Sequence, residues 1–257
     1  MKTGRKIIFI GSGNVATHLA IALSKAGNNI VQIFSQTLEH AQSLAKKTQA
    51  TYIDDIEKIS CDADLYIFSV KDDALPEILA KMPKTTGVWV HTAGSVPMDI
   101  FKTHTDDYGV MYPLQTFSKN RDVNFSAIPV FIEGSDAKTA HFLEVLAKSV
   151  LENVQYLSSE KRKYLHLAAV FACNFTNHLY ALSAEILEKE SISFDVLKPL
   201  IFETVAKITE MKPKEAQTGP ALRFDKTIMK KHLTLLEDEQ IKNMYSLLSE
   251  SIYRRRE

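Results

Sequence analysis

Three small residues, Gly11, Gly13 and Ala16, follow an apolar run and precede a stretch of helical period. They fit the pattern G-x-G-x-x-G/A, in which the first glycine permits a tight turn and the second lets a diphosphate approach the backbone. The third small residue lets the helix pack close to a sheet, and the free N–H groups at the helix start would hold the phosphates. The candidate dinucleotide cradle therefore comprises Gly11, Ser12, Gly13, Asn14, Val15 and Ala16. A glycine-rich turn that binds nothing is the alternative.

The residues after the second apolar run bear on which dinucleotide would fit. NAD-binding chains normally place an Asp or Glu there to bind the ribose 2′-hydroxyl, whereas this chain has Ser35, Gln36 and Thr37. No carboxylate repels a 2′-phosphate at these positions and two hydroxyls could donate to one, so the sequence favours NADP over NAD. Glu39 is the residue that could reverse this preference, and Ser35 and Thr37 could also cap the following helix.

Small and hydrogen-bonding residues also follow three later apolar runs. Ligands of open α/β sheets lie outside the carboxyl ends of the strands, so these residues are expected beside the nicotinamide half of the cofactor and the substrate. The expected cofactor contacts are Ser69, Val70, Lys71, His91, Ala93, Gly94 and Ser95, and the expected substrate contacts include Tyr112 and Gln115. His91 could equally be a core histidine, and the pair Asp72 and Asp73 could cap a helix.

A polar stripe is expected on the first long helical stretch of the second half. Lys163, His166, Val170, Asn174 and Asn177 fall within about 60° of one direction at 100° per residue. Polar groups on a packed helix need partners, which a ligand, a water-filled interdomain groove or a subunit interface could supply. The two residues most suited to chemistry, His166 and Asn174, are about 12 Å apart along the helix axis. They could line one extended pocket in different roles.

One further cation, Arg223, lies in a predicted loop from Thr218 to Asp225. Its planar guanidinium matches a carboxylate or phosphate bidentately, which makes it a candidate substrate contact. The structural alternative is an ion pair with Asp225, which would also be the N-cap of the next helix.

The elements that must position these residues change character near residue 157. Apolar runs alternating with helical stretches predict a Rossmann-type, doubly wound and mainly parallel sheet, and the later stretches predict an all-α region. The strands are expected at 6–10, 30–34, 50–53, 65–70, 88–91, 108–112, 128–132 and 154–157. The helices of the second half are expected at 159–188, 194–211, 224–236 and 239–255. We therefore predict a dinucleotide-binding domain over residues 1–157 and a helical substrate and dimerisation domain over 158–257.

Charge and composition limit the partners of the 257 residues. The 31 basic and 31 acidic residues cancel, so nothing calls for nucleic acid or a membrane surface, and small molecules or copies of the chain are the expected partners. The two cysteines are far apart without metal-ligand spacing, which predicts reduced thiols and no metal. No apolar run resembles a leader or a membrane span, so a cytoplasmic protein is expected.

Taken together, five motifs resemble a bacterial family of NADP oxidoreductases that pairs a Rossmann-like domain with a helical domain of unknown function. The motifs are Gly11 to Ala16, His91 to Ser95, Tyr112 to Phe117, His166 to Asn174, and Thr218-Gly219-Pro220 through His232. The resemblance covers nearly the whole chain and implies a dimer built through the helical domain. More distantly, the chain is similar to pyrroline-5-carboxylate reductase, ketopantoate reductase and the β-hydroxyacid dehydrogenases.

This sequence departs from the hydroxyacid and ketopantoate enzymes at one pair of residues. There a lysine and an asparagine one helical turn apart act on the substrate, whereas here Asn174 has Val170 four residues before it, and Lys163 lies three turns away. Either His166 supplies the proton instead, or the chemistry is different.

The sequence thus predicts an NADP-dependent oxidoreductase that transfers hydride between nicotinamide and a small carbonyl, imine or hydroxy-acid substrate at the interdomain groove. His166 is expected to be the general acid/base and Asn174 to orient the substrate, with Lys163 a weaker candidate for holding a substrate anion. A sensor or scaffold that binds NADP(H) without catalysis, acting through a helical dimer domain, is the alternative.

Overall fold

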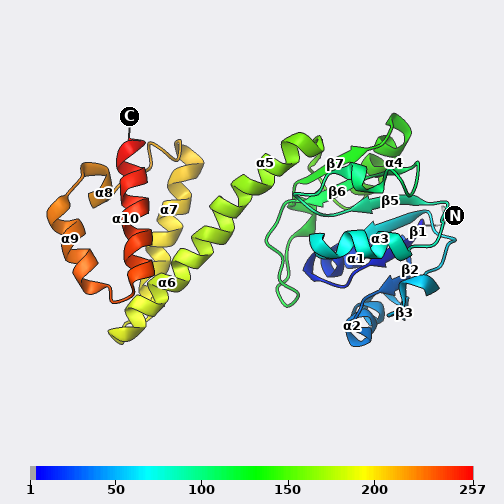
Figure 1. The fold of residues 1–257 in the computed structure, drawn as a ribbon, viewed down its shortest axis with the longest axis horizontal. Coiled ribbons are helices and arrows are strands. Elements are labelled where there is room, and N and C mark those ends of the chain that lie inside the picture. Colours follow the sequence, from blue (N-terminus) through cyan, green and yellow to red (C-terminus); the bar gives the residue numbers. More distant parts are fainter. Residues whose placement is uncertain (1–3, 257) are drawn as a thin grey trace. The chain divides into compact units, whose positions relative to one another are not determined.

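The computed structural model, drawn in Figure 1, describes residues 4–256. One sheet in it has the strand order β3-β2-β1-β4-β5-β6-β7-β8. The strands are β1 (Lys6–Ile10), β2 (Asn29–Phe34), β3 (Thr51–Ile53), β4 (Leu65–Phe68), β5 (Val88–His91), β6 (Tyr108–Pro113), β7 (Val130–Gly134) and β8 (Val154–Tyr156). Residues 1–3 lie outside the described range, and they include the first residues of the N-terminal segment that was not expected to be a leader.

The first six strands are parallel, and β7 is antiparallel to β6. Parallel neighbours need a crossover, usually a helix, whereas an antiparallel neighbour can be reached by a returning loop. Residues 114–129 form such a returning connection without an α-helix, and α4 (Ala137–Lys148) then provides the crossover to β8, which is parallel to β7. The predicted Rossmann-type and mainly parallel sheet is therefore confirmed.

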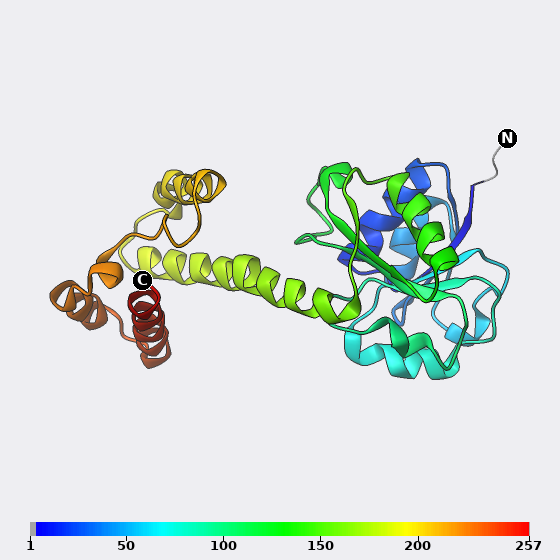
Figure 2. The ribbon, with the colours of Figure 1, turned by 90° about the horizontal axis from the view of Figure 1, so that it is seen from above.

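Successive residues of a strand point to opposite faces of the sheet, and here the residues on both faces are apolar. Helices therefore cover both faces. In β1, Ile7 and Phe9 pack with α1 (Asn14–Lys25), α2 (Leu38–Thr48) and α4, while Ile8 and Ile10 pack with α3 (Leu75–Lys81) and a 3₁₀ turn that contains Phe101. Figure 2 shows α3 on the face opposite α1 and α4. The carboxyl ends of the parallel strands are thereby held at a common edge.

The long helix that follows the sheet is interrupted by a π-helical turn, which the sequence analysis did not predict. It consists of α5 (Ser159–Ala169), the π turn (Val170–Phe175) and α6 (Thr176–Lys189). A π turn adds one residue to the α-helical repeat, so the residues beyond it are displaced around the axis by about 100°. The predicted common face of His166 and Asn177 assumed an unbroken helix and is therefore wrong.

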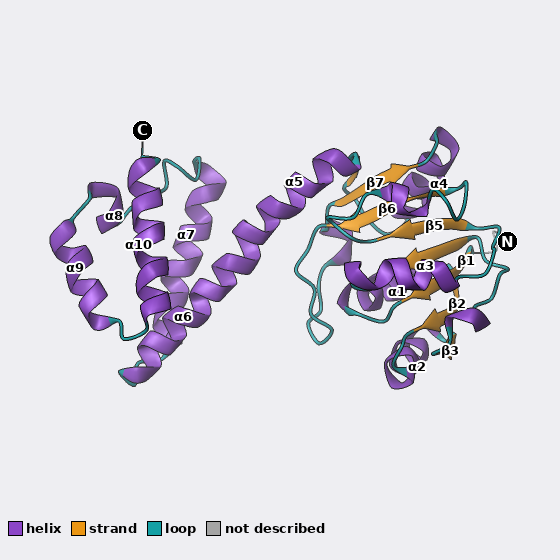
Figure 3. Cartoon of the chain, viewed as in Figure 1, coloured by secondary structure: helices purple, strands orange, loops and turns teal. Residues whose placement is uncertain are grey.

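The described residues up to Asn177 form one compact unit, and those from His178 onward form a second. The second unit contains most of α6, then α7 (Lys198–Glu210), α8 (Pro220–Arg223), α9 (Lys226–Leu235) and α10 (Glu239–Arg254), as coloured in Figure 3. Two contacts join α10 to its neighbours. Phe224, at the end of α8, stacks on Tyr253 of α10, and His232 of α9 is hydrogen-bonded to Tyr245 of α10. The all-α second part predicted from the sequence is confirmed, while the domain boundary at residue 157 stays a prediction.

Several element bounds differ from the predicted ones for local reasons. The predicted loop before Asp225 contains the short helix α8, and α9 begins only at Lys226 because the Asp225 carboxylate caps it by accepting from the N–H of Ile228 at 3.1 Å. A 3₁₀ turn precedes α7, which begins at Lys198. The strand expected at 128–132 is shifted to β7. Within residues 4–256, the helices are either too short or too polar to cross a membrane.

Candidate functional site

The turn between β1 and α1 has the geometry of an anion cradle. Gly11 has a φ of +112°, and a Cβ there would lie 2.2 Å from the Ser69 carbonyl oxygen, so only glycine is accommodated. Gly13 differs, because a Cβ built on it would meet no described atom within 4 Å. That open space lies directly at the start of α1, where a phosphate of a dinucleotide would approach.

The first turn of α1 also leaves its N–H groups available. Gly13 is the N-cap and offers no capping side chain, and no acidic residue lies in the first turn. Asn14 instead donates from its Nδ2 to the Phe117 carbonyl at 2.7 Å, and His18 Nε2 is 2.9 Å from the Ser118 carbonyl. The segment after β6 is thereby held beside the cradle.

At the end of β2, Ser35 is connected to the cradle rather than to a helix cap. Ser12 Oγ donates to Ser35 Oγ at 3.0 Å, and Thr37, the N-cap of α2, makes no capping hydrogen bond with its side chain. The exposed Gln36 lines a hollow of about 270 Å³ whose other lining residues are Phe34, Asp54, Asp55, Ile56, Glu57, Glu77, Ile78 and Lys81. The carboxylates among these residues make the hollow unfavourable for a phosphate and leave Ser35 and Thr37 as the neutral donors nearby.

Hydrogen bonds connect the loops after β4 and β5. Thr92 Oγ1 donates to Ser69 Oγ at 3.0 Å, and the exposed Ser95 hydroxyl donates to the Asp72 carboxylate. Asp72 was expected to cap a helix, but its carboxylate is paired with Ser95, and the short 3₁₀ turn there has no side-chain cap. Val70 and Ala93 are half-buried and Lys71 is exposed. These loops present small and polar groups at the edge of the sheet that also carries the cradle.

His91 is a core residue, which is one of the two alternatives left open by the sequence. Its side chain is fully buried, its ring packs at 5.6 Å from that of Phe101, and its Nδ1 accepts from the N–H of Ala93 at 3.2 Å. Burial, assisted by the nearby Arg162 charge, lowers the pKa of His91 to about 3. The ring therefore stays neutral in the core and supports the Ala93-Gly94 backbone.

His166 is half-buried on helix α5, and its ring packs directly on Gly94 in the loop after β5. A Cβ at Gly94 would be 2.5 Å from the His166 ring, so glycine is required there. His166 Nδ1 is 3.0 Å from the hydroxyl of Tyr112, which is almost fully buried at the end of β6. Burial raises the pKa of Tyr112, and the charge of Arg162 partly opposes this effect. Two proton-carrying groups thus meet at the carboxyl ends of β5 and β6.

The other polar residues predicted on the long helix are exposed. Lys163 forms an ion pair with Glu160 at 2.5 Å on the same helix, Asn174 lies in the π turn, and Asn177 lies beyond it. Gln115 is also exposed, and its Oε1 accepts from the N–H of Thr116 at 2.7 Å. The structure therefore brings His166 and Tyr112 together but does not add these side chains to that pair.

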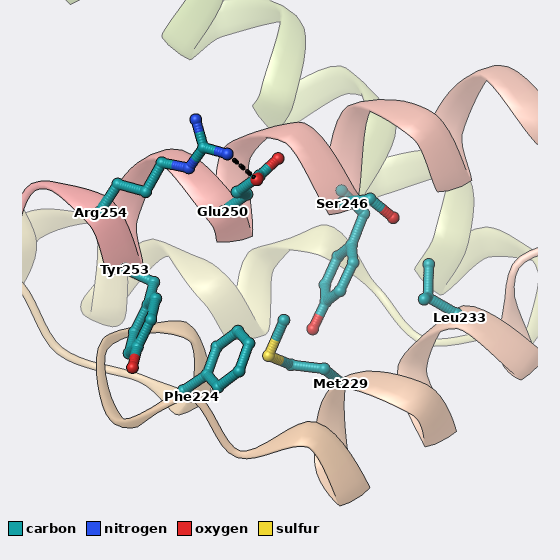
Figure 4. Close-up of a pocket in the computed structure, with 8 residues that line it drawn as sticks. Phe224, Met229, Leu233, Ser246, Glu250, Tyr253 and Arg254 are labelled. Atoms are coloured by element: carbon teal, nitrogen blue, oxygen red, sulfur yellow. Dashed lines mark hydrogen bonds and ion pairs between the residues drawn. The ribbon is translucent and has the colours of Figure 1, made fainter.

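Arg223 belongs to the second unit, at the exposed end of α8. In the described part of the chain it forms no ion pair with Asp225, whose carboxylate caps α9 as predicted. Beside it, an apolar hollow of about 390 Å³ is lined by Phe224, Met229, Leu233, Tyr245, Ser246, Glu250, Tyr253 and Arg254 (Figure 4). None of the predicted site residues lines this hollow.

Sequence reasoning missed the residues that hold α5 against the sheet. Arg162 is 1 % exposed and pairs with Glu133 of β7 at 2.9 Å, and Ser159 bonds to both. The signal was present in the lone acidic residue of the apolar strand Val130–Gly134. A charge at a strand end is usually solvated, so the sequence alone does not assign this residue a buried partner.

The fold and the cradle define a dinucleotide-binding protein of the Rossmann class. Residues 6–90 match the family described as NADP oxidoreductase, coenzyme F420-dependent, and residues 128–252 match a domain of unknown function. The chain is 47 % identical to BF3122 of Bacteroides fragilis, provisionally named an NADP oxidoreductase, over 98 % of this chain and 99 % of that one, with a TM-score of 0.92. The chain belongs to this NADP oxidoreductase family. The predicted enzyme class and cofactor are thereby confirmed.

More distant structures share the fold. TM1727 of Thermotoga maritima is 21 % identical, with a TM-score of 0.70, over 97 % of this chain and 98 % of that one. The reductive aminase of Aspergillus terreus, in complex with NADPH and ethyl-5-oxohexanoate, is 14 % identical with a TM-score of 0.74, over 99 % and 95 %. The pyrroline-5-carboxylate reductase of Coxiella burnetii is 16 % identical with a TM-score of 0.58, over 99 % and 98 %. A search of curated proteins gives no match.

Proposed function

We propose that this enzyme reduces a small substrate containing a C=N or C=O bond, or oxidises the corresponding amine or hydroxy acid, beside His166. The observation that carries the proposal is the hydrogen bond between His166 and Tyr112 above Gly94, at the carboxyl ends of β5 and β6. Nicotinamide sites of this fold class lie outside the carboxyl ends of the strands. When bound, NADPH would supply the hydride for the reduction, or NADP⁺ would accept it in the oxidation, while the protein would exchange the proton and orient the substrate.

The cofactor contacts are proposed along the same edge of the sheet. The N–H groups at Gly13, Asn14 and Val15 would hold the diphosphate, because the space beside Gly13 is open and the first turn of α1 carries no acid. Ser35 and Thr37 would donate to the 2′-phosphate, and the hollow beside Gln36 would take the adenine base. Ser69, Val70, Lys71, Ala93 and Ser95 would line the nicotinamide half.

His166 is the proposed general acid/base, and Tyr112 is its orienting partner as well as a substrate contact. With Nδ1 bonded to the Tyr112 hydroxyl, Nε2 is the nitrogen left to exchange a proton with the substrate. Asn174 would orient the substrate, while Lys163, Gln115, Asn177 and Arg223 are proposed only as groups that could hold its polar ends. Lys163 would first have to release Glu160.

The imine is the substrate class that the similar structures favour, since their names include reductive aminases, imine reductases and a pyrroline-5-carboxylate reductase. An imine can arrive already protonated and then needs little acid catalysis from the protein, whereas a carbonyl needs a proton donor such as His166. The two classes therefore respond differently to the loss of His166.

The test is to follow NADPH oxidation with a panel of cyclic imines and 2-oxo acids in the native enzyme and in His166→Ala. We expect turnover of at least one class, and a loss of at least about 100-fold in kcat for any carbonyl substrate in the variant. NADPH affinity should be retained, and the exposed His141→Ala on α4 serves as the matched control. A protein that binds NADPH but oxidises it with no probe, or a variant that reduces carbonyls at the native rate, would contradict the proposal.

We further propose that the enzyme is a homodimer in which a second copy covers the helical surface. Among the described residues from His178 onward, only Ala221 and Ser249 are buried. Large apolar side chains are exposed on α7, where Leu200 is 63 % and Phe202 71 % exposed. So much exposed apolar surface marks an interaction site, and a self-complementary interface is the commonest solution.

A further inference from the structure

A buried ion pair lies at the base of α5, close to the two proton-carrying groups. Arg162 is 1 % exposed, and its Nη1 donates to Glu133 Oε2 at 2.9 Å. Its Nη2 donates to the Val96 carbonyl and to Ser159 Oγ at 3.1 Å. Ser159 Oγ in turn donates to Glu133 Oε2 at 2.6 Å and accepts from the N–H of Met98 at 3.0 Å. The pair therefore connects α5, β7 and the segment after β5.

The same geometry relates the pair to His166 and Tyr112. Arg162 precedes His166 by four residues in an α-helix, so the two side chains lie one turn apart on one face. Glu133 is opposite Val110 in the β6–β7 ladder, and Tyr112 follows Val110 by two residues, so Glu133 and Tyr112 leave the sheet on the same face. Arg162 thus shares a helix face with His166, and Glu133 shares a sheet face with Tyr112.

The charged and titratable groups around Tyr112 come from each element packed against it. His166 is bonded to Tyr112 from α5, and Arg162 is on the same helix. Glu133 of β7 and the neutral His91 of β5 are both opposite Val110, two residues before Tyr112, and Tyr108 is on the same strand. Of these, Arg162 is the group whose charge lowers the pKa of Tyr112, against the larger upward effect of burial. A buried ion pair is seldom more stabilising than an apolar pair of similar volume, so stability alone does not account for keeping this one.

We propose that Arg162 and Glu133 form a positioning pair, which holds His166 on Tyr112 and keeps the Arg162 cation beside the Tyr112 hydroxyl. Arg162 acts through Tyr112 and touches no reacting atom in this account. The consequence for turnover rests on the proposed function of His166 and Tyr112, but the effect on the Tyr112 hydroxyl does not.

The test is a pH titration of the protein labelled with ¹³Cζ-tyrosine, followed by NMR, in which Tyr112→Phe assigns the Tyr112 signal. Two variants isolate the Arg162 charge: Glu133→Gln, which leaves that charge uncompensated, and the double variant Glu133→Gln with Arg162→Gln. In the first, the pKa of Tyr112 is expected to fall below the native value. In the double variant it is expected to rise above that of Glu133→Gln.

This order separates an electrostatic role from a loosened structure. Water entering a loosened site would relieve the burial of Tyr112 and lower its pKa in both variants, and more in the double one. A Tyr112 pKa in the double variant at or below that of Glu133→Gln would therefore overturn the proposal. The double variant keeps no uncompensated charge, which favours its folding. If it does not fold, Arg162→Lys decides, since the retained charge should keep the Tyr112 pKa near native and a rise would contradict the proposal.

Turnover supplies the second measurement. The double variant should bind NADPH as the native enzyme does and lose at least about tenfold in kcat, because small displacements of a catalytic group are costly. Lys148→Gln, which breaks the exposed ion pair with Glu144 on α4, should change neither the Tyr112 signal nor kcat. If the native enzyme reduces none of the probes, the proposed function fails, while the NMR titration still decides the positioning role.

Discussion

At the scale of single residues, the structure distinguishes glycines and histidines that look alike in the sequence. Gly11 is required by its positive φ and by the Ser69 carbonyl, Gly94 by the His166 ring, and Gly13 by no atom of residues 4–256. His91 is fully buried and neutral, whereas His166 is half-buried and bonded to Tyr112. Only the residues with space around them, or with a proton to exchange, are candidates for contact with a ligand.

The buried His91 predicts a pH dependence of stability. Its pKa is about 3 in the folded chain and 6.5 as the ordinary value, so the unfolded chain binds the proton first as the pH falls. Its contribution to stability is therefore fully present above pH 6.5 and is lost progressively between pH 6.5 and about 3. Chemical denaturation across this window should show a shallower decline for His91→Leu than for the native enzyme. The exposed His141→Leu should retain the native decline, and an identical slope in all three would contradict the assignment.

At the scale of elements, the positions of strands and helices could be predicted from the sequence, but their exact interruptions could not. Apolar runs and glycine turns predicted the β1–α1–β2 unit because parallel strands need continuous apolar residues and a tight phosphate-binding turn. The π turn at Val170–Phe175 has no composition that distinguishes it from an α-helix. The contact of His166 with Tyr112 depends on how α5 meets β6, which periodicity does not specify.

The attachment of α5 to the sheet yields a stability prediction. Arg162→Met leaves Glu133 without its cation at a site where Arg162 is 1 % and Glu133 16 % exposed. Breaking one side of a buried pair costs about 3–5 kcal/mol of unfolding free energy. The exposed pair of Lys148 and Glu144 gives the comparison, since Lys148→Met should cost under about 1 kcal/mol. Urea unfolding of both variants measures this difference, and equal losses would show that the Arg162 pair is not the attachment point.

At the scale of the whole molecule, the two compact units have different sources of stability. The unit up to Asn177 has two apolar clusters, one on each face of its sheet. The unit from His178 onward has almost no buried side chains within the described residues. Helices with so little burial gain most of their stability from packing against another surface, so the second unit is expected to depend on a partner copy.

The dimer makes this expectation measurable. Sedimentation equilibrium should give twice the chain mass of 28.9 kDa. Phe202→Glu, which places a charge on the exposed apolar surface of α7, should shift the enzyme toward monomer and lower its thermal stability. Glu203→Gln on the same helix alters a side chain that is already polar and exposed, so it should leave the mass unchanged. A native protein that sediments as a monomer at all concentrations contradicts the proposal.

Isothermal calorimetry of NADPH binding to the native enzyme and to Gly13→Ala tests the central claim most directly. A methyl group at position 13 would meet no described atom within 4 Å and should leave thermal unfolding unchanged, but it would occupy the space expected for the diphosphate. We predict that NADPH binds the native enzyme more tightly than NADH does, and that Gly13→Ala weakens NADPH binding at least about tenfold. Equal NADPH affinity in the two proteins, or no binding to the native enzyme, would contradict the account.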